Sequence, residues 1–497
     1  MIKRIYGITI VAFWVAMLIC MPITSMPFVA KLVSTGTTVA SPAGLFLMAL
    51  IITWFIPNLL RGRSLPEQVN PLVVFAMVAI GITIVWVFFT EPPYKANDPL
   101  KQSMEAVVTL GIGLAFYFLT TLWLTDIKKL ELTIRLINWS GIIILAWAAV
   151  QAISWFVFHR YPDWVRYIHE MYSVGPLFRQ RVSGFALEPS WFAHQLNMLY
   201  LPLWLALSIN RVSAHRLRIF HLTLENLLLA GGVIGLFLSY SRVGLAAFLM
   251  MIGYILIRIN LYLIRRIQNG FLTPRYKMFY RFNPKVVSTG LGLAFIAGYI
   301  VVIAGLAIIL SRIDPRMARL FDFNLNHPDG ILYYANDLTF ASRLVYWQAG
   351  WNVFNQYPWF GVGLGKVGFY MPQNLSTFAW RLVEVRDLVF RSTSPLNIKS
   401  LWVRLLAETG IAGFSLFVSW LWGLWQTSKL VEMTNQPLLK SISWAGKFVI
   451  IGLILEGFSV DTFALPYFWV SLGILTASYG LIKRDEVFDG GFNQHGT

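Results

Sequence analysis

The chain has 497 residues, of which 57% are hydrophobic and 13% are charged, and its formal net charge is +17. Soluble domains average about 45 to 50% apolar and about 25% charged residues, so this composition excludes an ordinary water-soluble fold and indicates a membrane protein. The positive charge falls mostly in loops between apolar runs, where it indicates membrane topology, and we expect no nucleic-acid partner. The single cysteine, Cys20, excludes a disulfide framework.

Apolar stretches long enough to cross a bilayer recur along the chain. A helix needs about 20 residues to span the hydrocarbon core, and the sequence contains twelve runs of about that length. It therefore predicts an all-α fold, a polytopic transmembrane helical bundle of about 12 spans. The runs lie near residues 5–25, 43–60, 71–90, 103–124, 137–158, 191–209, 225–240, 242–264, 286–310, 400–426, 447–461 and 463–482.

These spans predict how the chain is divided. We expect transmembrane helices 1–9 in residues 1–310, a large extracytoplasmic (periplasmic) loop between spans 9 and 10 at residues 311–399, transmembrane helices 10–12 in residues 400–484 and a cytoplasmic tail at residues 485–497. Lys and Arg gather in the short loops on one side of the membrane. Because such loops stay in the cytoplasm, both termini are expected to be cytoplasmic.

Two segments on the opposite side are basic in spite of this rule, and long translocated segments are largely exempt from it. Their charge favours either a loop that rests on anionic lipid headgroups or an anion site, since the planar fork of arginine suits phosphate. The segments are residues 311–400 and residues 159–190, the latter with Arg160, Arg166, Arg179 and Arg181.

A first candidate site lies in the shorter of these basic segments. Pro189 and Ser190 indicate the start of a helix, so the preceding Glu188 would lie beside the positive end of a helix dipole. Glu188 either satisfies that helix end or acts as a general base or a ligand of an acceptor hydroxyl. In the second case, Arg179 and Arg181 would bind an anionic group of the substrate.

A second candidate is the turn between the seventh and eighth apolar runs, which contains Ser239, Ser241 and Arg242. An ionisable residue at membrane depth is a functional candidate, although Arg242 can also extend its head to the outer headgroups. Ser241 and the helix that follows would complete a cradle for phosphate.

The late loop supplies a third candidate. Arg343 and Trp347 are four residues apart and therefore share one face of a helix. Gly361, Gly363 and Gly365 follow, and they predict a tight turn rather than a nucleotide-binding loop, because the strand-to-helix context is missing.

A fourth candidate segment begins at Asn397 and leads through Arg404 and Glu408 into the tenth span. Glu408 in an apolar helix is either paired with a basic neighbour or functional. No Asp/His cluster has metal-ligand spacing, and the chain has neither a P-loop nor a G-x-S-x-G motif. We therefore expect no metal site and no cofactor, and a metal-independent reaction on a phosphorylated lipid remains.

These motifs resemble those of the O-antigen ligase and O-antigen polymerase family, membrane glycosyltransferases that use polyprenyl-diphosphate-linked glycans. The resemblance includes the layout of the spans and the Ser241-Arg242 turn. Its most specific part is R-L-x-x-W, from Arg343 to Trp347, followed by Y-P-W-F-G-V-G-L-G, which ends at Gly365.

The segment from Asn397 is similar to the closing motif of this family, in which ligases typically carry a His-Asn pair. Here Leu396 precedes Asn397, so the histidine is missing, and this favours a polymerase. The Glu-Pro-Ser sequence at Glu188 also looks like that of polymerase members.

The resemblance implies a polysaccharide polymerase (for O-antigen or exopolysaccharide) in the bacterial cytoplasmic (inner) membrane. It would join polyprenyl-diphosphate-linked oligosaccharide repeat units at the outer face, with membrane lipid around it and a chain-length regulator as a further partner. Arg242, Arg343 and Arg181 would stabilise the departing diphosphate, and Glu188 would be the base. Trp347, Asn397, Ser241 and Arg179 would contribute to binding.

Two other functions remain open. A ligase-type transferase would move finished glycan to a lipid or protein acceptor. A twelve-span transporter or lipid flippase would instead show related halves with helices broken near the midplane, whereas this chain is asymmetric and has one dominant late loop.

Overall fold

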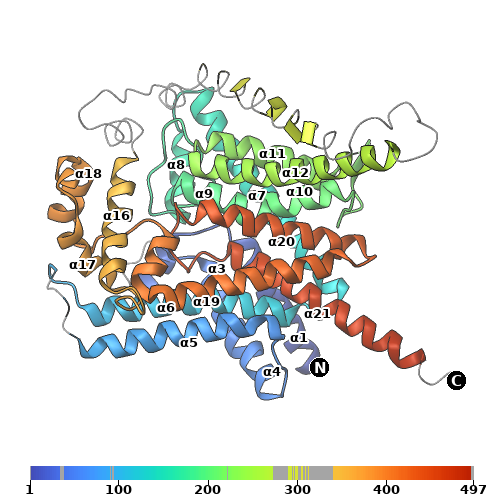
Figure 1. Ribbon diagram of the computed structural model, residues 1–497, viewed down its shortest axis with the longest axis horizontal. Helices are drawn as coiled ribbons and strands as arrows, with labels where there is room; N and C mark the ends of the chain where they lie inside the picture. The colour runs from blue at the N-terminus through green and yellow to red at the C-terminus, as the bar shows by residue number, and fades with distance from the viewer. Residues whose placement is uncertain are drawn as a thin grey trace. The chain divides into compact units, whose positions relative to one another are not determined.

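The computed structural model describes residues 2–33, 39–89, 91, 94–220, 222–271 and 340–493, together with scattered residues between 289 and 312. These residues are almost entirely helical, which confirms the predicted all-α polytopic fold (Figure 1). Among them, a single short ribbon pairs β1 (Arg218–Ile219) with β2 (Leu222–Thr223) in antiparallel register. The first of two compact units contains Met1–Phe248, Ala349–Asn374 and Thr393–Thr497, and the second contains Leu249–Gln348 and Leu375–Ser392.

The long helices of the first unit are joined by short turns and by two π-helical segments, η1 (Ile51–Phe55) and η4 (Leu196–Tyr200). Helices α12 and α16 each begin in one unit and end in the other. The α-helices are α1 (Ile2–Cys20), α2 (Pro27–Val33), α3 (Pro42–Leu50), α4 (Ile56–Leu60), α5 (Asn70–Val85), α6 (Pro99–Trp123), α7 (Ile127–Phe156), α8 (Asp163–Tyr172), α9 (Pro189–Gln195), α10 (Leu201–Ile209), α11 (Leu224–Leu238), α12 (Arg242–Phe271), α16 (Ala341–Gln356), α17 (Val367–Asn374), α18 (Val383–Arg386), α19 (Leu401–Glu432), α20 (Pro437–Glu456) and α21 (Tyr467–Asn493). The 3-10 and remaining π segments are η2 (Glu67–Val69), η3 (Trp86–Phe88), η7 (Thr377–Arg381) and η8 (Asp387–Arg391).

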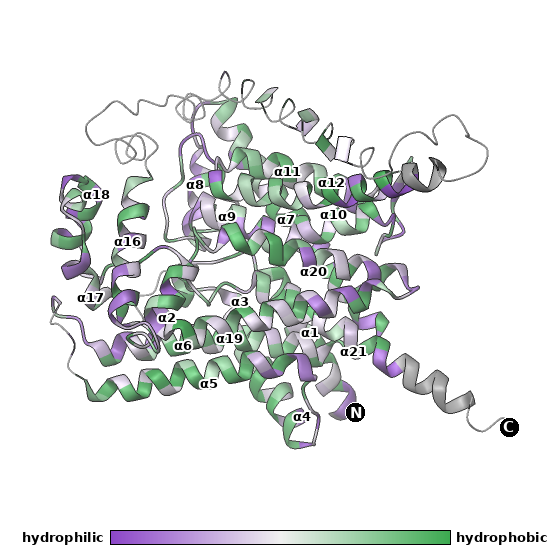
Figure 2. Cartoon of the chain, in the orientation of Figure 1, coloured by the Kyte–Doolittle hydropathy of each residue, from purple (hydrophilic) through white to green (hydrophobic). Residues whose placement is uncertain are grey.

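Eight helices among the described residues are long and apolar enough to cross a membrane, and each overlaps one of the predicted spans. Figure 2 shows the apolar residues along such helices, for example α5. Three further predicted spans correspond to the 15-residue helix α11, to the continuous run from α9 through η4 to α10, and to α21. The remaining one, at 286–310, lies largely outside the described residues, as does the stretch 313–339 of the expected late loop.

Helix α20 differs from the predicted span at 447–461, because it begins at Pro437 and ends at Glu456. Lys447, which the sequence suggests as a loop residue, is 1% exposed and forms an ion pair with Glu432 of α19. A charge inside an apolar helix is tolerated when it is paired, so the helix continues through Lys447.

Aromatic side chains hold α6, α19 and α21 together, and these helices contact one another in the first unit (Figure 1). The ring of Tyr117 lies 5.3 Å from that of Trp420 and 6.5 Å from that of Trp469. Its hydroxyl lies 2.7 Å from the Thr476 hydroxyl, so the polar end of this buried ring is also satisfied. These ring contacts and this hydrogen bond hold α6, α19 and α21 against one another.

Helix α19 is broken at Gly410, where φ is 62° and ψ is −167°. A break in an apolar helix leaves N–H and C=O groups without partners, at a high cost where water is absent. The preceding loop supplies these partners. The N–H groups of Val362 and Gly363 donate to the carbonyls of Ala407 (3.0 Å) and Glu408 (2.9 Å), and those of Ile411 and Ala412 donate to the carbonyls of Pro358 (2.8 Å) and Trp359 (3.2 Å).

The loop can approach this closely only because its turns are glycines, as the sequence predicts. Gly361, Gly363 and Gly365 all have positive φ, at 67°, 87° and 77°. A Cβ atom on Gly361 would lie 2.4 Å from the carbonyl carbon of Glu408, and one on Gly365 would lie 2.4 Å from the carbonyl oxygen of Gln102. Gly361 therefore allows the loop to contact the break in α19, and Gly365 allows it to contact α6.

We predict that Gly410→Ala destabilises the protein, because a Cβ at Gly410 would lie 2.3 Å from the Trp359 oxygen and the backbone there is left-handed. The strained backbone alone costs about 1–3 kcal/mol. Thermal unfolding of the purified protein in detergent measures the effect. The matched control is Gly423→Ala in the same helix, where no atom lies within 4 Å of the added carbon. Equal melting temperatures for the two variants would contradict the role of the break.

Candidate functional site

The predicted Arg181 lies against the turn that precedes Arg242. Its Nε donates to the carbonyl oxygen of Ser239 at 3.0 Å. The next residue, Val182, donates its N–H to the carbonyl of Leu238, also at 3.0 Å. Two segments about 60 residues apart in sequence thus meet at the end of α11 and the start of α12.

The turn itself is built by two buried serines. The N–H of Ser241 donates to the hydroxyl of Ser239 at 3.2 Å, and Tyr240 between them has a left-handed φ of 48°. The hydroxyl of Ser241 accepts the N–H of Gly244 at 3.3 Å and so caps α12. Ser241 therefore helps to define the helix end at which half-buried Arg242 stands.

Glu188 is exposed at the start of α9, and its carboxylate accepts the hydroxyl of Ser190 at 3.0 Å. Helix α9 packs closely on the first turn of α12, because a Cβ on Gly244 would lie 2.7 Å from the Cβ of Ala193. Ala193 is five residues after Glu188, which corresponds to about 7 to 8 Å along a helix. Glu188, Arg181 and Arg242 consequently belong to one corner of the first unit.

A buried polar bridge connects this corner to the end of α20. The Nδ2 of Asn197 donates to the carbonyl of Gly244 at 2.8 Å and to the carboxylate of Glu456 at 2.7 Å. Nδ1 of His194 lies 3.3 Å from the other oxygen of that carboxylate. The side chains of Asn197, Glu456 and His194 are at most 2% exposed. The contacts replace water for the Glu456 carboxylate and for Nδ2 of Asn197, whereas Nε2 of His194 and Oδ1 of Asn197 have no hydrogen-bond partner among the described residues.

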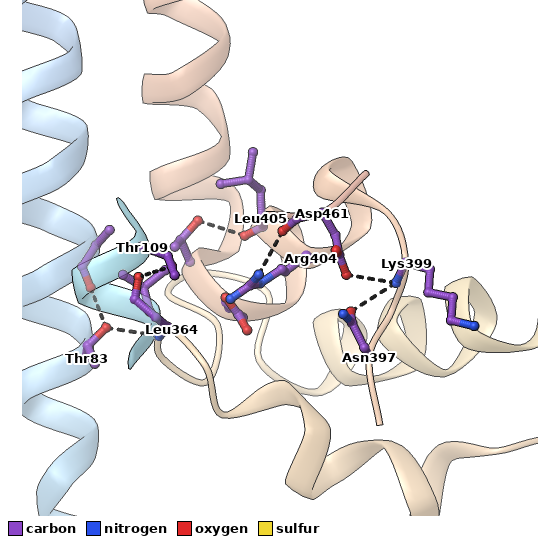
Figure 3. Close-up of polar contacts among 12 residues, drawn as sticks. Thr83, Thr109, Leu364, Asn397, Lys399, Arg404, Leu405 and Asp461 are labelled. Carbon is purple, nitrogen blue, oxygen red and sulfur yellow. Dashed lines mark hydrogen bonds and ion pairs between the residues drawn. The ribbon is translucent and has the colours of Figure 1, made fainter. Parts of the chain in front are cut away.

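Beyond Glu456, the end of α20 adjoins the segment that contains Asn397 (Figure 3). The N–H of Lys399 donates to Oδ1 of Asn397 at 3.1 Å and to Oδ2 of Asp461 at 3.2 Å. Arg404 donates to the backbone oxygen of Asp461 at 2.7 Å and to the carboxylate of Glu408 at 2.9 Å. Glu408 is thus paired with a basic neighbour one helical turn away, which was one of its two predicted roles.

Asp461, Glu456 and Asn197 are the members of this region that sequence reasoning missed. Asp461 is half-buried, and it follows α20 after only a short turn. No local motif marks it, because its partners Lys399 and Arg404 come from the start of a different helix.

Arg179, the remaining predicted arginine of the segment, lines a cavity of about 590 Å³ together with Arg160 and Arg166. Its neighbour Arg181 turns to the Ser239 carbonyl instead. Arg179 and Arg181 are therefore close in sequence, but their side chains have different neighbours.

Arg343 and Trp347 lie in the second unit, on the first turns of α16. Both side chains are half-buried, and the ring of Trp347 packs edge-on against Phe340 at 5.2 Å. Nearby in the same unit, Ser342 donates its hydroxyl to Glu384 at 2.7 Å. These contacts fix the start of α16 within its own unit.

The apolar helices define the class as a polytopic, all-α membrane protein, in which the Arg242 turn, Arg181 and Glu188 lie near helix ends. Residues 227–418, about two fifths of the chain, match the family model described as O-antigen ligase, so this segment is similar to that family. The matched segment begins in α11 and includes Arg242, Arg343, the glycine turn and Glu408. No curated protein matches the chain.

We predict that Asn197→Ala lowers the stability of the protein by about 1–3 kcal/mol, because it leaves the Glu456 carboxylate and the Gly244 carbonyl without their shared donor. Thermal unfolding in detergent is the measurement. Asn210→Ala serves as the control, since Asn210 is half-buried and caps only the end of its own helix at Ala206. A loss at Asn197 no larger than the loss at Asn210 would argue against the bridge.

Proposed function

We propose that the protein is a polysaccharide polymerase that joins polyprenyl-diphosphate-linked oligosaccharide repeat units at the outer face of the bacterial cytoplasmic membrane, with both termini in the cytoplasm. The match of residues 227–418 to the O-antigen ligase family model supports a membrane glycosyltransferase of the ligase or polymerase type. The absence of a histidine before Asn397, where Leu396 stands, favours the polymerase.

The observation that carries the proposal is the hydrogen bond from Arg181 to the Ser239 carbonyl beside Arg242. It brings a second guanidinium group to the start of α12, where the positive end of a helix dipole also favours an anion. A diphosphate leaving group needs positive charge where negative charge develops. We assign Arg343 to the same task on the strength of its motif alone.

The reaction we propose is a displacement at an anomeric carbon. The hydroxyl oxygen of one lipid-linked repeat forms a bond to the anomeric carbon of the other chain. The bond from that carbon to the diphosphate oxygen breaks, and polyprenyl diphosphate leaves with the electron pair. The hydroxyl proton passes to a carboxylate of the protein. This scheme requires no metal ion and no cofactor.

Two carboxylates compete for the role of base. Glu188 is exposed at the same corner as Arg181 and Arg242. Asp461 is half-buried beside Asn397, and its Oδ2 accepts the Lys399 N–H. Because the Lys399 N–H joins Asp461 to Asn397, in the segment where ligases typically carry their histidine, Asp461 is the second candidate.

A ligase-type transferase is the nearest alternative, and incubation of the purified protein with lipid-linked repeats separates the two. Longer lipid-linked chains in the absence of an acceptor indicate a polymerase, and transfer only to an added lipid or protein acceptor indicates a ligase. A transporter or flippase would yield neither product. Addition of a chain-length regulator, the further partner that we propose, would narrow the distribution of lengths.

Arg242→Ala and Arg343→Ala should each reduce elongation by about 100-fold or more, because each removes a charge that stabilises the departing diphosphate. The length distribution of lipid-linked glycan is the measurement. Arg216→Ala, which alters an exposed arginine on the predicted cytoplasmic side, is the control and should leave elongation unchanged. Normal chain-length ladders from both variants would refute the assignment.

Glu188→Gln and Asp461→Asn distinguish the two candidate bases. Loss of a general base costs about 10²- to 10⁴-fold in rate, so the variant of the true base should be slow with little change in KM. The other variant should retain most of its activity. If both variants elongate at the normal rate, neither carboxylate accepts the proton.

A further inference from the structure

A cavity lies in the first unit, in the segment that follows α7. It has a volume of about 590 Å³, which falls in the range of small-molecule binding sites. Its lining does not include the Arg242 turn, and of its lining residues only Arg179 was expected to bind substrate in the reaction above. The lining residues are Trp155, His159, Arg160, Tyr161, Arg166, His169, Glu170, Gly175, Pro176, Leu177 and Arg179.

The polar wall of this cavity is strongly basic. Arg160, Arg166 and Arg179 contribute three permanent positive charges, and Glu170 is the one carboxylate among the lining residues. All three arginines are exposed, so their guanidinium groups remain accessible to a ligand from solution. Arginine forks bind carboxylate and phosphate oxygens in pairs, so the ligand of the cavity should be an anion.

The lining also contains the aromatic side chains of Trp155 and Tyr161. The rings of Trp155 and Tyr161 lie 5.6 Å apart. Burial raises the pKa of Tyr161 to about 12, so its hydroxyl stays protonated and donates to the carbonyl of Phe178 at 2.7 Å. Tyr161 also belongs to a packed cluster with Trp147, Val165 and Tyr172. The ring platform is therefore held in place before any ligand arrives.

His169 belongs to this support rather than to the basic wall. Burial lowers the pKa of His169, so its imidazole is neutral near pH 7. Its Nε2 lies 2.8 Å from the carbonyl of Gly175, and its Nδ1 lies 2.9 Å from the Tyr172 hydroxyl. The positive charge of the cavity thus comes from the arginines.

The cavity is close to the proposed diphosphate site. Arg179 lines the cavity, and Arg181 bonds the turn before Arg242. Two residues of fully extended chain span at most about 7 Å. A glycan whose diphosphate is bound at Arg181 and Arg242 would therefore have its sugars within reach of the cavity.

We infer that this cavity binds an acidic sugar residue of the glycan, with its carboxylate on Arg160, Arg166 and Arg179 and its ring face on Trp155. This inference rests on the proposed function and specifies its substrate class, a glycan that contains a carboxylated sugar. A second phosphate would bind the arginines but would make no contact with an aromatic ring face. A carboxylated sugar would contact both, with its carboxylate on the arginines and its ring on Trp155.

The test is a binding measurement with a soluble probe, so that no transfer is needed. Full-length protein in nanodiscs of phosphatidylcholine is titrated calorimetrically with trigalacturonic acid and with its carboxyl-reduced, neutral counterpart. We expect the acidic trisaccharide to bind at least about tenfold more tightly. Arg166→Gln and Arg179→Gln should each weaken it about tenfold, whereas Lys101→Gln, which alters an exposed lysine on α6, should not change it.

Three results would overturn the inference. One is equal binding of the two trisaccharides, or no effect of the arginine substitutions. Another is that the arginine substitutions weaken the binding of inorganic pyrophosphate but not that of trigalacturonate, since the cavity would then be a diphosphate site. The third is that phosphatidylglycerol in the nanodisc abolishes the binding of the trisaccharide, which would indicate a lipid headgroup site.

Parallel elongation assays distinguish this inference from the proposed function. If the protein binds trigalacturonate through the arginines but elongates no lipid-linked substrate, the polymerase proposal is wrong and the sugar site stands. If the protein elongates neutral repeats, and its arginine variants elongate acidic repeats at the normal rate, the polymerase proposal stands and the sugar site is wrong.

Discussion

The fold depends on the requirement that every backbone N–H and C=O group in apolar surroundings has a partner. An unbroken helix meets this requirement by itself, but α19 does not, because Gly410 interrupts it. The loop from Pro358 to Gly363 crosses the gap and bonds the groups on both sides of it. The same loop is anchored to α5, where the N–H of Leu364 donates to Thr83 at 3.0 Å (Figure 3). A segment outside the helices is thus an integral part of the helical bundle.

Side-chain pairing extends this principle to the polar corner. Asn197 and Glu456 bond across three elements, and Lys366 pairs with Glu91 and donates to the Trp86 carbonyl at 2.6 Å. In each pair the carboxylate is bonded to a donor away from water. The contacts involve the start of α12, the end of α20 and the residues directly after α5, and the start of α12 carries Arg242 of the proposed reaction.

The sequence predicts the parts of this structure that depend on local patterns. Apolar runs locate the helices, and Gly361 to Gly365 identify a turn, because both signals lie within one stretch of chain. The start of α20 was misplaced because the partner of Lys447, Glu432, lies in the preceding helix. For the same reason the sequence marks Glu188 and Arg242 but not Asp461, whose neighbours are set by the packing of α19 on α20. Contacts between distant segments leave no periodic signal in the chain.

The contact between the Pro358–Gly365 loop and the break in α19 limits which parts of this chain can be exchanged separately with those of similar proteins. The Pro358–Gly365 loop and the residues around Gly410 are complementary surfaces, since a carbon atom added to either would collide with the backbone of the other. A recombination that transfers the Pro358–Gly365 loop without α19, or α19 without the loop, would disrupt these contacts. The loop and the helix are therefore expected to be inherited as one block, and a chimera made to alter glycan specificity should be cut outside residues 358–412.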